Sequence, residues 1–191
     1  MLDATPNGTR RTVEGMVFLA LFALTIPAAN WMIHNVGTTC VPEGPCLIPV
    51  APGLKGPSGV LMIGLALVLR DLVQRRLGVK AAFFAIAVGT VISAALAPPS
   101  LVLASAVAFL LAETVDLAVY TPLQRRGLVM AVVASSMVGL VVDSVVFLHL
   151  AFGNLDFLLG QVIGKAWMVL ATLPFIAWLR RRDARIGLQP A

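Results

Sequence analysis

Six long runs of apolar residues follow one another along the chain, separated by short polar segments. A run of roughly 18 or more apolar residues is long enough to span a bilayer as a helix. The runs lack the period-2 alternation of barrel strands, so they predict helices. The six predicted helices comprise about residues 13–33, 57–73, 79–97, 101–120, 128–150 and 157–179.

The composition supports a location in a membrane. Of the 191 residues, 59% are hydrophobic and only 12% are charged, with a mean hydropathy of +0.95. Soluble domains usually contain about a quarter charged residues. A chain this short and this apolar could not cover its own surface in water. We therefore expect an all-α integral membrane protein, a six-helix bundle that forms a single domain over residues 1–191.

The basic residues are distributed unevenly among the connections. They occur before the first predicted helix, around the turn between the second and third helices, between the fourth and fifth helices and after the sixth helix: Arg10, Arg11, Arg70, Arg75, Arg76, Lys80, Arg125, Arg126, Arg180, Arg181, Arg182 and Arg185. The other three connections contain only Lys55. Since positively charged loops stay in the cytoplasm, both termini are predicted to be cytoplasmic, in a bacterial inner membrane. Membrane topology therefore accounts for the net charge of +5, and we predict no nucleic-acid partner.

The longest connection, residues 34–56, is predicted to be external and contains two cysteines. In an oxidising compartment Cys40 and Cys46 could close a short disulfide loop, and two free thiols are the equal alternative. His34 is too distant to complete a good ligand set, so we predict no metal site and no cofactor.

Five ionisable residues lie within the predicted helices, where charge is costly and is a functional hypothesis by default. They are Asp71, Glu113, Asp116, Asp143 and Lys165. Spacings of three and four place Glu113, Asp116 and Tyr120 on one helix face. Carboxylates one turn apart in lipid repel each other and need a partner. That partner could be a bound cation, a proton or a ligand rich in N–H donors. In the structural alternative, the partner is the neighbouring Arg70.

Two further helices carry polar stripes that we expect to face the bundle interior. Ser136, Asp143 and Phe147 share one face, and Gln161 and Lys165 share another. A rise of about 1.5 Å per residue puts Asp143 and Lys165 at similar depth, which predicts an ion pair. Whether that pair is structural or binds substrate stays open.

Asn30 lies at the external end of the first predicted helix. It is a candidate to line an entrance to the bundle. No motif of a soluble enzyme is present, and we expect the protein not to be an enzyme.

Four segments resemble the VUT family, also known as the YhhQ-type queuosine precursor transporters. The two strongest are ASAVAFLLAETVDLAVY (residues 104–120), which precedes a basic turn, and SSMVGLVVDSVVF (residues 135–147). Weaker similarity occurs in LRDLVQRRLG (residues 69–78) and GQVIGK (residues 160–165). The resemblance implies import of a small molecule, for the best-known members a 7-deazaguanine such as 7-cyano-7-deazaguanine.

The resemblance also implies which residues bind that molecule: Asp71, Glu113, Asp116, Asp143, Gln161 and Lys165. Tyr120, Ser136 and Asn30 complete the candidate set. A guanine-like edge offers two adjacent N–H groups that suit a carboxylate bidentately, and an amide could meet the carbonyl. The chain departs from the family in its long external connection and in Gln74 and Arg75, where an acidic residue is expected.

We expect a secondary-type transporter that holds a purine-like substrate between its helices, with a buried carboxylate as a candidate for proton coupling. One alternative is the substrate-binding subunit of an energy-coupling-factor vitamin transporter, whose partner would be an ATPase module. Ala20 and Ala23 lack the spacing of four that such docking uses. The other alternative is a non-transporting membrane scaffold. Whether the protein forms a homodimer also stays open.

Overall fold

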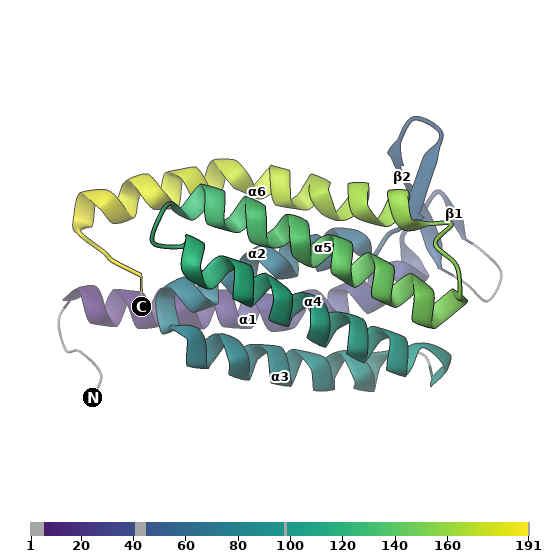
Figure 1. Ribbon diagram of the computed structural model, residues 1–191, viewed down its shortest axis with the longest axis horizontal. Coiled ribbons are helices and arrows are strands. Elements are labelled where there is room, and N and C mark those ends of the chain that lie inside the picture. Colours follow the sequence, from purple (N-terminus) through teal and green to yellow (C-terminus); the bar gives the residue numbers. More distant parts are fainter. Residues whose placement is uncertain (1–5, 41–44, 98, 191) are drawn as a thin grey trace.

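The computed structural model describes residues 6–40, 45–97 and 99–190, which form a bundle of six α-helices (Figure 1). The helices are α1 (Pro6–Asn35), α2 (Val60–Leu77), α3 (Val79–Leu96), α4 (Val102–Leu123), α5 (Leu128–Phe152) and α6 (Leu158–Ile186). The predicted ranges are close to these bounds. The main differences are that α1 begins at Pro6 rather than at residue 13, and α6 ends at Ile186 rather than at residue 179. The backbone of α6 continues past the apolar run because arginine and alanine, which predominate there, favour a helix.

Five of these six helices are long and apolar enough to cross a membrane, namely α1, α3, α4, α5 and α6. The exception is α2, whose second half carries Arg70, Asp71, Arg75 and Arg76. It packs against all five other helices, and its residues 66–76 are buried. The surrounding helices thus separate these charges from the outer surface of the bundle.

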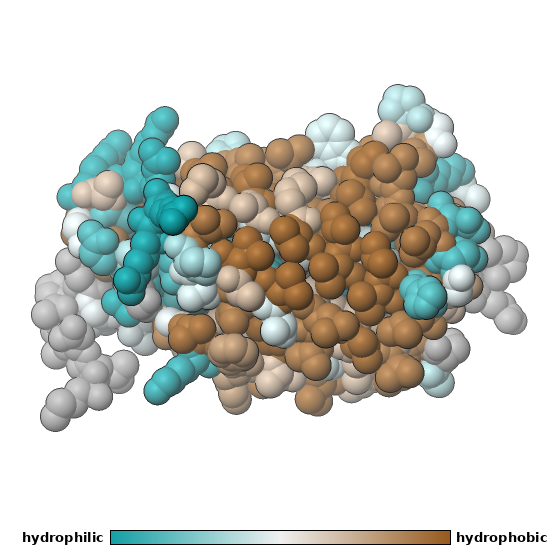
Figure 2. All heavy atoms as spheres, in the orientation of Figure 1, coloured by the Kyte–Doolittle hydropathy of each residue, from teal (hydrophilic) through white to brown (hydrophobic). Residues whose placement is uncertain are grey.

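The outer surface of the bundle is apolar over most of its length. Figure 2 shows a broad band of hydrophobic side chains, with hydrophilic residues gathered at the two ends. Large side chains in this surface include Phe84, Leu103 and Leu159, which are 66%, 70% and 60% exposed. Apolar patches of this extent mark contact with a membrane or another protein. Together with the five apolar helices, this surface is that of a multi-pass membrane protein.

The connection between α1 and α2 is more ordered than a plain loop. It contains a three-stranded antiparallel sheet in the order β1 (Thr39–Cys40), β2 (Cys46–Ala51) and β3 (Leu54–Pro57). A disulfide joins Cys40 to Cys46, which decides between the two alternatives for these cysteines. The sheet packs on α1 and α6 at the end of the bundle opposite the C-terminal end of α6 (Figure 1).

Two glycines allow close helix packing beside the buried charges. A Cβ on Gly64 of α2 would collide with the backbone of Lys165 on α6. A Cβ on Gly139 of α5 would lie 3.1 Å from the Cβ of Asp116 on α4. Small residues at such crossings let helices approach closely in lipid. The positions of Lys165 and Asp116 therefore depend on the absence of a side chain opposite them.

Candidate functional site

The ammonium group of Lys165 lies at the centre of a polar cluster between α5 and α6. Its Nζ donates to Asp143 Oδ2 at 2.5 Å, to Ser144 Oγ at 2.7 Å and to Gln161 Oε1 at 2.9 Å. Three acceptors match the three donors of an ammonium group. The structure thus confirms the predicted Asp143–Lys165 ion pair and adds Ser144, which the helical stripes did not select. We refer to these four residues as the Lys165 cluster.

The Lys165 cluster borders a cavity of about 270 Å³. The cavity lies at the end of the bundle that carries the sheet, since Pro45 and Pro57 also line it. Its volume is slightly below the roughly 300 to 1,000 Å³ typical of sites for drug-sized ligands. Polar lining residues are Asn30, His34, Ser93, Ser105, Asp143, Gln161 and Lys165, and the phenylalanines are Phe109, Phe147 and Phe152. This mixture of aromatic walls and a few polar groups is typical of a small-molecule site.

A second polar cluster surrounds Arg70 on α2. The guanidinium forms ion pairs with Asp71 at 2.9 Å, with Glu113 at 3.1 Å and with Asp116 at 2.8 Å. The four side chains are at most 2% exposed. Ser135 Oγ also donates to Asp71 Oδ2 at 2.8 Å. Arg70 is thus the basic partner of all three carboxylates, as the sequence allowed for Glu113 and Asp116. We refer to Arg70 and its three carboxylates as the Arg70 cluster.

The nine predicted site residues therefore separate into groups. Four of them line the cavity: Asn30, Asp143, Gln161 and Lys165. Four others lie away from its lining, in or beside the Arg70 cluster: Asp71, Glu113, Asp116 and Tyr120, whose ring centre is 5.9 Å from the Arg70 guanidinium carbon. Ser136 is buried in α5, and its Oγ has no hydrogen-bond partner within the described residues.

Aromatic residues of the cavity were largely missed from the sequence. Phe147 was placed on the face of Asp143, one turn further along α5, but was not assigned a role. Phe109 precedes Glu113 by one turn on α4, so the same helical spacing could have found it. Both line the cavity.

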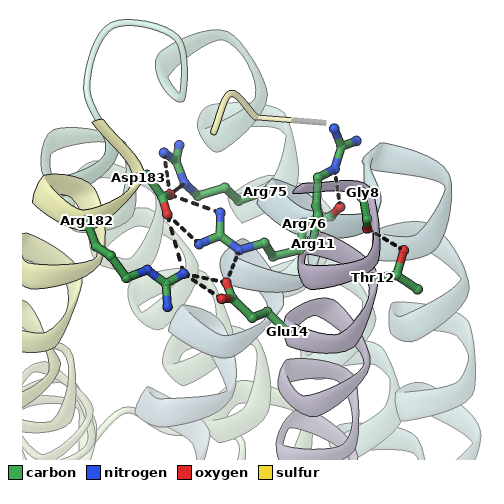
Figure 3. A network of polar contacts seen from close by, with 8 residues as sticks. All are labelled: Gly8, Arg11, Thr12, Glu14, Arg75, Arg76, Arg182 and Asp183. Carbon is green, nitrogen blue, oxygen red and sulfur yellow. Dashed lines mark hydrogen bonds and ion pairs between the residues drawn. The ribbon is translucent and has the colours of Figure 1, made fainter. Parts of the chain in front are cut away.

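A third polar network closes the opposite end of the bundle (Figure 3). Asp183 of α6 accepts from Arg75 at 2.9 Å and from Arg76 at 2.8 Å. Glu14 of α1 accepts from Arg76 at 2.8 Å and from Arg182 at 2.6 Å. These five residues tie α1, α2 and α6 together. The predicted end of α2 at residue 73 is corrected, because Arg75 and Arg76 still lie on this helix and are buried.

An apolar helical bundle has a small cavity with a few polar groups near one end and an ionic network at the other, an arrangement suited to a membrane protein that binds small molecules. A model of the family described as "putative vitamin uptake transporter" matches residues 93–179. This match supports the resemblance to the VUT family of transporters that the residues indicated, and it favours a transporter over an enzyme. The matched stretch contains Glu113, Asp116, Asp143 and Lys165. No curated protein and no solved structure shows significant similarity to the chain.

Proposed function

We propose that this transporter imports a 7-deazaguanine queuosine precursor, or a related purine-like compound, across a bacterial inner membrane. The observation that carries the proposal is the cavity of about 270 Å³ that combines aromatic walls with Asn30, Asp143, Gln161 and Lys165. A planar, hydrogen-bonding heterocycle matches this combination of apolar faces and polar groups.

The polar groups of the cavity complement the edge of a guanine-like ring. The Asp143 side chain is 12% exposed, against 1% for Lys165, so the carboxylate is the more accessible member of the pair. Lys165 occupies Oδ2 of Asp143, and in the proposal Oδ1 accepts an N–H from the ligand. Because Gln161 Oε1 accepts from Lys165, its amide nitrogen remains to donate to the ligand carbonyl.

We further propose that α2 also spans the membrane, in addition to the five apolar helices, and that both termini lie in the cytoplasm. This arrangement puts the sheet and the cavity on the external side and the Glu14–Asp183 network on the internal side. The bundle would then have its cavity on the external side and be closed by the ionic network on the cytoplasmic side. The Arg70 cluster contains one cation and three carboxylates, and burial of the surplus charge is costly. We propose that protons neutralise this surplus and that the cluster couples them to transport.

Uptake of a radiolabelled 7-deazaguanine tests the proposal in cells that lack their own importer. The wild-type protein is expected to restore uptake. Asp143→Asn removes the charge that faces the ligand and should lower uptake by roughly tenfold or more, since a bond to a charged group contributes about 1.5 to 3 kcal/mol. Asp156→Asn is the matched control, because it makes the same change at an exposed carboxylate in the α5–α6 turn.

Membrane content is measured for each protein so that uptake is compared at equal expression. If the wild-type protein is present in the membrane and restores no uptake of 7-deazaguanines or purines, the substrate assignment is wrong. Equal uptake by Asp143→Asn and Asp156→Asn would show instead that the cavity is not the binding site.

A further inference from the structure

A second cavity lies at the end of the bundle opposite the sheet, along one face of α6. Its volume is about 370 Å³, and it is lined by Pro174, Ala177, Trp178, Arg181, Arg182 and Arg185. These positions are separated by steps of one and three residues and therefore form one continuous helical stripe. Three of the six lining residues are arginines and none is acidic, so this cavity is suited to an anion.

Charges around this cavity are not balanced within the described part of the chain. The adjoining network sets Arg75, Arg76 and Arg182 against only two carboxylates, Glu14 and Asp183 (Figure 3). Arg182 donates to Glu14 through Nη2, whereas its Nε is buried without a hydrogen-bond partner among the described residues. A buried donor without an acceptor is costly. An acceptor oxygen from a bound anion would remove this cost.

Exposed arginines add further positive charge to the same face. The side chains of Arg181 and Arg185 are exposed, and no ion pair within the described residues involves either one. They are four residues apart, so both can reach one group between them. Arginine binds phosphate oxygens in a bidentate fork, which makes three arginines a strong site for a phosphate group.

The remaining wall of the cavity is apolar and faces outward. Trp178 is 52% exposed, and the Arg182 guanidinium carbon lies 5.2 Å from the centre of its ring. Pro174 lies one turn earlier on α6 and is also exposed. Figure 2 shows that the apolar band of the molecule gives way to polar residues toward this end. Tryptophan is enriched where a membrane meets water, which is the level of the lipid phosphates.

We propose that Arg181, Arg182 and Arg185 bind the phosphate group of an anionic phospholipid, with the lipid chains against Trp178 and Pro174. Free phosphate shares the charge but gains nothing from the apolar wall, which is why the lipid is the expected occupant. This site goes beyond substrate import and does not depend on the substrate.

Native mass spectrometry of the purified protein tests the site with phosphatidylglycerol and phosphatidylcholine in equal amounts. The wild-type protein is expected to retain phosphatidylglycerol preferentially. The variant Arg181→Gln/Arg185→Gln should lower that preference by roughly tenfold, given the contribution of each basic residue near anionic lipid. Arg125→Gln/Arg126→Gln is the matched control, because it removes two exposed arginines from the turn between α4 and α5.

Three outcomes would overturn the proposal. One is an absence of lipid preference in the wild-type protein. The second is an equal loss in both double variants, which would reduce the effect to overall charge. The third is complete displacement of the lipid by millimolar inorganic phosphate, which would identify a free-phosphate site. Unfolding temperatures of both variants within a few degrees of wild type show that the fold is retained. The charge-preserving Arg181→Lys/Arg185→Lys variant is expected to keep more of the preference than the glutamine variant.

Discussion

The Lys165 cluster and the Arg70 cluster are each built around a basic side chain held by carboxylate oxygens, but only the Lys165 cluster borders the cavity. Asp143 is 12% exposed, whereas Arg70, Asp71 and Asp116 are completely inaccessible. The two clusters also differ in charge, because Lys165 has one acidic partner and Arg70 has three. A buried charge in a membrane protein is thus not by itself a ligand site. Its access to a cavity is the distinguishing property.

The largest expected effect is the loss of stability in Arg70→Met. The substitution leaves three buried carboxylates without a cation, and removal of one member of a buried ion pair typically costs about 3 to 5 kcal/mol. Thermal unfolding in detergent measures the change. Arg125→Met, an exposed arginine in the α4–α5 turn, serves as the control and should be nearly neutral. Similar unfolding temperatures for the two variants would show that the ion pairs of the buried Arg70 cluster do not stabilise the fold.

A smaller loss of stability is expected for Lys165→Met. This change orphans only Asp143, which can be hydrated through the cavity, so we expect a cost of about 1 to 3 kcal/mol. Uptake should nevertheless fall strongly, because the lysine holds both Asp143 and Gln161 in place. The distinction between the clusters fails if Lys165→Met is as destabilising as Arg70→Met in the same unfolding assay.

The smallest effect is expected for Ser136→Ala. Ser136 Oγ has no hydrogen-bond partner within the described residues, and the residue does not line the cavity. Its removal should change the free energy of unfolding by no more than about 1 kcal/mol and leave uptake at the wild-type level. Ser144→Ala is the variant to compare with Ser136→Ala, because it removes a hydroxyl that accepts a hydrogen bond from Lys165. A transport defect in Ser136→Ala would indicate that this residue belongs to the substrate site after all.

Features that follow from distance along one helix could be predicted from the sequence. The lengths of the apolar runs gave the helices, and the rise per residue put Asp143 and Lys165 at the same depth, where they form an ion pair. The same reasoning could not tell which helices are neighbours or how each is rotated. The family resemblance grouped Asp71, Glu113 and Asp116 with the cavity residues, and helix spacing alone could not show that all three gather around Arg70.

Contacts between segments that are far apart in the chain could not be predicted from the sequence. Arg75 pairs with Asp183, 108 residues further along the chain, and its position in a basic run matched the ordinary pattern of a cytoplasmic turn. The strands between α1 and α2 were missed for a different reason. They contain two to six residues each and include prolines, so no alternation of apolar and polar positions develops.

Helix α2 has a consequence for how the protein is made. A charged residue at the centre of an inserting helix costs about 2.5 to 3.5 kcal/mol, and α2 carries Arg70 and Asp71 side by side. The ribosome delivers α2 before α4 and α6, which supply Glu113, Asp116 and Asp183. Only Asp71 and Glu14 among the acidic partners of this helix already exist when it leaves the ribosome. If α2 spans the membrane as proposed, its stable integration depends on these later helices, and assembly of the bundle is then a collective event rather than a series of independent insertions.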